Sequence, residues 1–193
     1  MSWDKEERME SLEMKIDEGE VDEEILPIVE SINSNPDYFT TSSCAGRIAL
    51  IEMPGLGDKE AAEFLGKWHR EVEVEDIIDA FSKAKTNTMV FLLAQSPIIH
   101  IRCRNLESAV KLRNIAVESG LKYSTLKSLT LNSKNEPVKV VVEILSSENI
   151  HVPVARSGKL FPDRDYLAFL VENANQALKR AREKLERFKA SLA

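Results

Sequence analysis

The spacing of apolar residues predicts helices at both ends of the chain. An apolar repeat from Trp3 to Ile16 fits one helix that Gly19 would stop, and residues 22–34 fit a second. From residue 164 to 192, apolar side chains recur every three or four positions, which predicts a helix of roughly 43 Å. Shorter helices are predicted at residues 58–66, 75–84 and 106–119.

Between the helical ends, runs rich in β-branched and aromatic residues predict strands. They lie at residues 38–41, 47–53, 89–94, 98–103, 123–131, 138–145 and 150–155. The runs at 89–94 and 98–103 are split only by Gln95, Ser96 and Pro97, which indicates a hairpin. Because strands outnumber crossover helices and follow one another directly, the pattern favours an α+β fold with a mainly antiparallel sheet.

Strands followed by helices occur twice, which is compatible with duplication of a strand-then-helix unit. We expect one compact domain over residues 1–193, in keeping with the length. It would comprise an acidic helical region at 1–34, a first half at 35–120, and a second half at 121–193 with the long helix.

Composition narrows the class of protein. At 193 residues and 43% hydrophobic positions the chain can bury a core, and no apolar run approaches the roughly 20 residues that span a bilayer. We therefore expect a cytoplasmic protein without a membrane partner. Cys44 and Cys103 lie far apart without a paired cysteine, so we expect neither a disulfide framework nor a metal site. The sequence says nothing about the oligomeric state.

The net charge of −6 alone argues against a nucleic-acid partner, but the charge is unevenly distributed. Residues 1–30 hold three basic and twelve acidic side chains, whereas the remaining 163 residues hold 23 basic and 20 acidic ones. A basic face is therefore possible beyond residue 30. The acidic stretch is either a solvated helix that keeps the protein soluble or a regulatory element.

Two polar segments of the first half are candidates for chemistry. Residues 40–47, TTSSCAGR, predict a polar loop that could bind an anion or a base edge, or a turn whose hydroxyls satisfy their own backbone. Residues 67–70, KWHR, place His69 at a helix end or in a loop, where it could accept a proton or be merely structural.

Two further segments carry basic groups. Alternation places His100, Arg102 and Arg104 on one face of a strand, which indicates a phosphate or carboxylate site or a charged edge strand. Residues 154–160, VARSGKL, fit an anion-binding loop or an ordinary hairpin. The glycines at 55 and 57 do not form a nucleotide loop, because Glu60 stands where a third glycine would be.

The order of these segments carries a resemblance. SSCAGR, GKWHR, PIIHIRCRNLESAVKLRNIAVESG, SGKL and VENANQALKRAREKLERF together resemble the wybutosine-synthesis tRNA methyltransferases of archaea and eukaryotes, over most of residues 38–188. The resemblance implies methylation of ring nitrogen N4 on a wyosine-type guanine beside the anticodon of phenylalanine tRNA. It also implies S-adenosylmethionine as the methyl donor, and a barrel-like sheet unlike that of Rossmann methyltransferases.

The resemblance also points to site residues. The matching positions are Ser42, Ser43, Cys44, Gly46, Arg47, Lys67, His69, His100, Cys103, Gly158, Lys159, Asn173 and Asn175, and the sequence departs at Ala45, where a serine is expected. We expect Ser43 and His69 to be catalytic. The residues expected to contact the donor are Ser42, Arg47, His100 and Lys159. Those expected to contact the tRNA are Lys67, Arg102, Arg104, Gly158 and Asn173.

These assignments require Ser43, His69, His100 and Lys159 to line one cavity. Basic positions of the last helix, Lys179, Arg180 and Arg182, are further candidates for the tRNA backbone, unless that helix is a salt-bridged strut. Two other functions compete with the methyltransferase. One is a module that binds tRNA or a partner of the pathway without catalysis, and the other is a thiol hydrolase using Cys44 with His69.

Overall fold

The computed structural model describes residues 3–19 and 21–192, which form two compact units. Unit 1 comprises Met1–Ala45, Pro97–Ser147 and Ala181–Ala193, and unit 2 comprises Gly46–Ser96 and Glu148–Arg180. The chain therefore passes between the units several times, and each sheet takes strands from both predicted halves. Whether the units form the single domain expected from the sequence stays a prediction.

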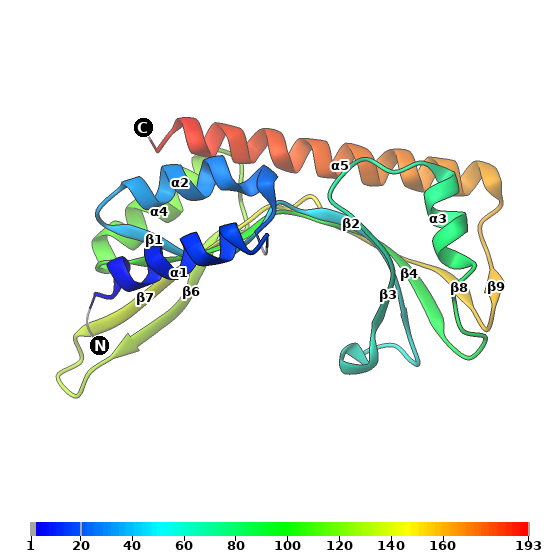
Figure 1. Cartoon of the computed structure of the whole chain (residues 1–193), viewed down its shortest axis with the longest axis horizontal. Helices are drawn as coiled ribbons and strands as arrows, with labels where there is room; N and C mark the ends of the chain where they lie inside the picture. Colours follow the sequence, from blue (N-terminus) through cyan, green and yellow to red (C-terminus); the bar gives the residue numbers. More distant parts are fainter. Residues whose placement is uncertain (1–2, 20, 193) are drawn as a thin grey trace. The chain divides into compact units, whose positions relative to one another are not determined.

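Unit 1 is built on a four-stranded antiparallel sheet in the order β1-β5-β7-β6 (Figure 1). One face of this sheet presents Ile99, Ile101 and Val142 to the core shared with the helices. The elements of unit 1 are α1 (Lys5–Asp17), η1 (Glu23–Ile25), α2 (Leu26–Ser34), β1 (Tyr38–Cys44), β5 (Ile98–Cys103), α4 (Leu106–Glu118), β6 (Thr125–Leu131) and β7 (Pro137–Leu145).

Unit 2 is built on a five-stranded antiparallel sheet in the order β3-β2-β4-β8-β9, whose central strands curve along their length (Figure 1). Its elements are β2 (Arg47–Met53), η2 (Lys59–Ala61), β3 (Glu63–Trp68), α3 (Val74–Phe81), β4 (Met89–Gln95), β8 (Ile150–Arg156) and β9 (Lys159–Leu160). The long helix α5 (Arg164–Ala190) begins in unit 2, and its last turns belong to unit 1.

Both faces of the sheet in unit 2 bury apolar side chains. One face packs Ile48, Leu50 and Leu92 against α3 and the first half of α5. The opposite face carries a smaller cluster of Ala49, Met53, Phe91 and Leu93. Strands buried on both faces lose strict alternation, which is why β2 and β4 appear in the sequence as continuous apolar runs.

Most predicted elements are confirmed. The α+β class with antiparallel, barrel-like strands holds, although the described strands form two sheets rather than one. Pro27 lies in the first turn of α2, where its missing amide hydrogen leaves no helical bond unmade. Gly120 follows α4 with φ of 97°, the left-handed conformation that ends helices. Among the described residues, no helix is both long and apolar enough to cross a membrane.

Three predictions from the sequence were wrong. β4 and β5 do not form a hairpin, because β4 pairs with β2 and β8 while β5 pairs with β1 and β7. Residues 63–66 belong to β3 rather than a helix, since β2 offers them an antiparallel partner. The expected polar loop at 40–47 is mostly strand, with only Ala45 and Gly46 between β1 and β2.

Candidate functional site

The hydroxyl-rich motif lies on β1, beside β5. A register shift between Thr40 and Ser42 makes a bulge, which re-aims the side chains that follow it. Thr41 donates through its hydroxyl to the carbonyl of His100 at 3.2 Å, and the Oγ of Ser42 lies 2.7 Å from Nδ1 of His100. The bulge therefore brings the first and third predicted motifs, 58 residues apart, into direct contact.

His100 is held on both sides of its ring. Its Nε2 lies 2.8 Å from Oε1 of Glu143 on β7, and the same oxygen accepts from Nζ of Lys127 at 2.7 Å. A carboxylate accepts hydrogen bonds, so Nε2 of His100 carries a proton. In the neutral ring Nδ1 is then an acceptor, and the hydroxyl of Ser42 donates to it. The result is a chain that runs Ser42, His100, Glu143, Lys127.

Glu143 stays ionised although its side chain is largely buried. Its side chain is 10% exposed, and burial alone would raise its pKa. Hydrogen bonds and charge from Lys127 and then His100 outweigh that effect and hold the pKa of Glu143 below its usual value. Glu143 is therefore an ionised carboxylate near neutral pH, and it fixes the orientation of the His100 ring.

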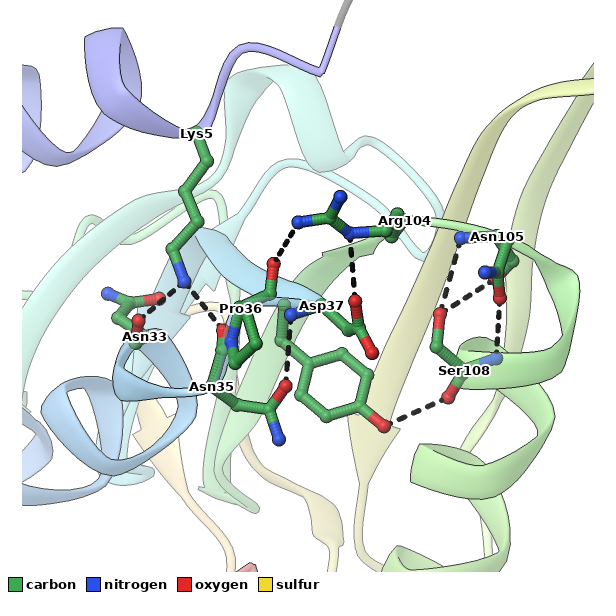
Figure 2. Close-up of polar contacts among 9 residues, drawn as sticks. Lys5, Asn33, Asn35, Pro36, Asp37, Arg104, Asn105 and Ser108 are labelled. Atoms are coloured by element: carbon green, nitrogen blue, oxygen red, sulfur yellow. Dashed lines mark hydrogen bonds and ion pairs between the residues drawn. The ribbon is translucent and has the colours of Figure 1, made fainter.

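The two arginines beside His100 serve the fold. Arg102 is only 6% exposed, and its Nη2 donates to the carbonyl of Val138 at 2.7 Å. Burial lowers the pKa of its guanidinium. Arg104 pairs with Asp37 at 2.8 Å and donates to the carbonyl of Pro36 at 3.0 Å (Figure 2). Contact of either arginine with tRNA stays a prediction.

In unit 2 the second motif meets the backbone of the first. Nδ1 of His69 lies 3.1 Å from the carbonyl oxygen of Gly46, which adopts a φ of 82° that a side chain would strain. Since a carbonyl only accepts, Nδ1 carries the proton and Nε2 is the basic nitrogen of the neutral ring. His69 is thus fixed in the tautomer that a proton acceptor requires.

Arg47 is positioned by two neighbours on the sheet. Its Nε donates to Oε1 of Gln95 at 2.7 Å, and its Cζ lies 5.2 Å from the centroid of the Phe64 ring. Hydrogen bonding fixes the orientation of the guanidinium plane, and the ring face supplies a cation–π contact. Gln95 and Phe64 also line a hollow on the same face of the sheet.

This hollow occupies about 730 Å³ in unit 2. Cross-strand pairing explains it, because Ile51 opposes Phe91, Phe91 opposes Pro153, and Leu93 opposes His151, so all point to one face. Its walls are mostly apolar, with Gln95 and His151 as polar groups. A flat, largely apolar ring system fits such a hollow.

Lys159 does not join His69 and Arg47. Lys159 pairs with Arg156, which opposes Met89, whereas Arg47 opposes Gln95 at the other end of β4. Six residues of strand separate the two ends by about 20 Å. Within unit 2 the expected cavity therefore does not contain both His69 and Lys159, and a role for Lys159 in donor binding stays a prediction.

The other predicted contact residues lie on outer strands and on α5. Lys67 is exposed on β3, and Gly158 adopts a φ of 74° in the turn before β9. Asn173 bonds the carbonyl of Phe169 in its own helix at 2.7 Å. Asn175 instead bonds both the amide and the carbonyl of Val72, each at 2.9 Å, and so joins α5 to the segment before α3.

Sequence reasoning missed Glu143, Lys127 and Gln95. Glu143 and Gln95 contact motif residues across a sheet, and Lys127 contacts Glu143. No spacing in the sequence predicts such contacts. Cys103, a motif residue, is 1% exposed, and burial raises the pKa of its thiol to about 12. It is therefore a core residue without nucleophilic character.

The chain is similar in sequence to a family of methyltransferases. The family model described as "Methyltransferase TYW3" matches residues 3–193. A protein of Pyrococcus horikoshii named tRNA(Phe) 7-((3-amino-3-carboxypropyl)-4-demethylwyosine(37)-N(4))-methyltransferase 1 is 44% identical over 188 residues, which cover 97% of this chain and 92% of that protein. A Methanocaldococcus jannaschii protein, named in the same words without the final number, is 41% identical over 96% of this chain and 93% of its own.

A solved structure agrees in fold. The structure titled "Structure of PH1069 protein from Pyrococcus horikoshii" superposes with a TM-score of 0.90 at 44% identity, covering 98% of this chain and 94% of that one. A hypothetical protein from Aeropyrum pernix superposes with a TM-score of 0.74 at 26% identity, over 89% of this chain and 96% of its own. Similarity therefore extends over the whole chain in both sequence and fold.

Proposed function

Because the chain belongs to the TYW3 methyltransferase family, we propose that it transfers a methyl group from S-adenosylmethionine to N4 of a demethylwyosine-type base in phenylalanine tRNA. The relatives carry this activity in their names, and the match covers more than nine tenths of both chains. A tRNA substrate in turn supports a cytoplasmic location. The observation that carries the proposal is the contact network that surrounds the family motifs.

The residues present suit the proposed donor. S-adenosylmethionine combines a flat adenine, a ribose and a charged amino-acid end, and when bound it supplies an activated methyl group. The apolar hollow of unit 2, bordered by Arg47 and Gln95, fits a flat ring. In unit 1 the oxygen of Ser42, whose proton is donated to His100, can still accept a hydrogen bond from a polar group of the donor, and His100 holds that hydroxyl in place. We retain both residues and Arg47 as donor contacts.

Methylation of an N–H nitrogen releases one proton, so the protein needs an acceptor. His69 meets that need, because the Gly46 carbonyl keeps its proton on Nδ1 and leaves Nε2 as the basic nitrogen. The residue would take the proton while the new carbon–nitrogen bond forms and the carbon–sulfur bond breaks. We assign His69 as the proton acceptor and Ser43, on the bulged strand, as a hydroxyl that orients the base.

Rigid positioning accounts for much of the rate enhancement in this proposal. The methyl group is already activated by its sulfonium, so the protein mainly aligns two reactants and excludes water, which can lower a barrier by about 7–11 kcal/mol. The chain of Ser42, His100, Glu143 and Lys127 is suited to this task, since each group is fixed by the next. Such fixed groups lose little entropy when a ligand binds.

The test uses labelled S-adenosylmethionine and phenylalanine tRNA from cells that lack the enzyme. Wild-type protein should transfer label to the modified nucleoside, and His69→Gln should slow a single turnover by about 10²–10⁴-fold. Lys111→Gln, which neutralises an exposed residue on α4, is the matched control and should behave like wild type. Tight tRNA binding without any transfer would instead support the non-catalytic module.

A further inference from the structure

Helix α1 sorts its charges onto two sides. Lys5, Arg8, Leu12 and Lys15 are separated by three, four and three positions, which places all four on one stripe of the helix. The acidic residues occupy the opposite side and are exposed, at Glu6, Glu7, Glu10, Glu13 and Asp17. Although residues 1–30 carry a net negative charge, the stripe of α1 that contains Leu12, which packs against the core of unit 1, is therefore basic and apolar. Arg8 and Lys15 on this stripe are exposed.

The basic side of α1 is held against the start of β1. Nζ of Lys5 donates to the carbonyls of Asn33 and Asn35, both at 2.6 Å, and so caps the end of α2 (Figure 2). Burial, and then the charge of Arg104, lowers the pKa of Lys5. Trp3 adds a second anchor, because its ring lies 5.0 Å from that of Phe39. These contacts fix where the next turns of α1 lie.

The next turns border a polar hollow of about 260 Å³ beside the hydroxyl motif. Arg8, Ser11, Leu12 and Lys15 line it from α1, residues 40–43 line it from β1, and Val21 completes the lining. Two cations and five hydroxyls thus surround this space. One of the five hydroxyls belongs to Ser42, which forms a hydrogen bond with His100. Of the described residues that line it, none is acidic, and Arg8 also forms an ion pair with Asp4, outside the hollow, at 3.8 Å.

We propose that this hollow is a subsite for the carboxylate of an amino-acid group. Arg8, Lys15 and the hydroxyls of Ser11 and Ser43 can donate hydrogen bonds, whereas Thr41 and Ser42 already donate to His100. A carboxylate accepts several such bonds at once. The hollow is smaller than the roughly 300–1,000 Å³ of sites that take a whole ligand, so it receives one end of a larger molecule. The acidic outer side of α1 would repel a run of phosphates, which disfavours the tRNA backbone as its occupant.

The proposed function, on which this inference rests, offers two sources of that carboxylate. The names of the relatives place a 3-amino-3-carboxypropyl group on the base that they methylate. The amino-acid end of S-adenosylmethionine has the same chemistry. Ser42, a proposed donor contact, and Ser43, a proposed base contact, both line this hollow, and the basic stripe of α1 suits either source. The N-terminal region, although acidic overall, then has a role in recognising the carboxylate, through the basic stripe that Lys5, Arg8 and Lys15 form on α1.

The experiment measures binding by the full-length protein and its variants Arg8→Gln and Lys15→Gln. One arm titrates S-adenosylhomocysteine by calorimetry, without tRNA. A second arm compares phenylalanine tRNA that carries the 3-amino-3-carboxypropyl group with the same tRNA carrying 4-demethylwyosine alone. Lys111→Gln serves as the charge-matched control, and circular dichroism checks that each variant keeps its helical content.

If the base supplies the carboxylate, each variant should bind the side-chain-bearing tRNA about tenfold more weakly and leave the other ligands unaffected. A loss confined to S-adenosylhomocysteine also supports the subsite and identifies the donor as its ligand. Equal weakening of both tRNAs would mean a phosphate contact and overturn the proposal, as would no change in any arm. Because the readout is binding, a wild-type protein that discriminates between the tRNAs but transfers no methyl group refutes the function alone.

Discussion

Glu143→Gln tests whether the carboxylate of Glu143 holds His100 in place within the hydrogen-bonded series of Ser42, His100, Glu143 and Lys127. The substitution preserves shape, removes the charge that accepts from His100 and Lys127, and leaves an amide in a site that is 10% exposed. A hydrogen bond to a charged group contributes about 1.5–3 kcal/mol, whereas the pair with Lys127, which is 52% exposed, contributes at most about 1 kcal/mol. The amide oxygen can still accept one bond, so we expect a loss of about 2 kcal/mol.

For a chain of this length, that loss should lower the melting temperature by about 4–8 °C. Urea unfolding of wild type and variant at pH 7 measures the free energy, with Lys111→Gln as a control that should match wild type. The pKa of Glu143 is lower in the folded protein than its usual 4.5. Its stabilisation is therefore fully present above pH 4.5 and is lost as pH falls through the folded value.

The difference between wild type and Glu143→Gln should accordingly shrink when both proteins are unfolded in acid. A variant as stable as wild type at pH 7 would mean that the carboxylate does not hold His100 in place. A difference that stays the same well below pH 4.5 would mean that the destabilisation comes from altered packing rather than from lost charge. Either result would refute the electrostatic account of this chain.

Three further predictions concern unit 2. Gly66→Ala should destabilise the protein by about 1–3 kcal/mol in urea unfolding, because an added Cβ would lie 2.1 Å from the Trp68 ring; an unchanged midpoint would show that the ring moves freely aside. Glu52→Gln should cost about 1–3 kcal/mol, since the 2% exposed carboxylate accepts from the Lys85 amide and the Thr88 hydroxyl, and calorimetry of both proteins would detect it. Arg47→Lys should retain the fold but weaken S-adenosylhomocysteine binding by about tenfold, because lysine keeps the charge and loses the planar fork; equal affinity would remove Arg47 from the donor site.

Helix α1 shows how composition can hide a site. The first 30 residues are strongly acidic, and a helix of that composition is expected to be solvated. Its three cations nevertheless lie on one stripe, and one of them, Lys5, ties that stripe to the end of α2. Net charge averages over the two sides of a helix, whereas a ligand meets only one. The spacing of like charges is therefore more informative than their sum.

The sequence alone determined most of the elements and indicated the family. Local periods of 3.6 and 2 residues reflect which side of an element is buried, so α2, α4, α5 and most strands could be predicted within a few residues. The ends of α4 and the place of Pro27 follow from backbone preferences that need no tertiary partner. The order of the polar motifs was enough to indicate the family that the comparisons then showed.

Only the tertiary structure decided which strands pair and which side chains meet. β4 and β5 are neighbours in the chain but belong to different sheets, while Ser42 meets His100 across 58 residues and His100 meets Glu143 across 43. A strand's own sequence fixes its two faces, but its partner depends on the competition among all available edges and on the closure of long loops. That is why the sequence identified His100 but missed Glu143, the group that orients it.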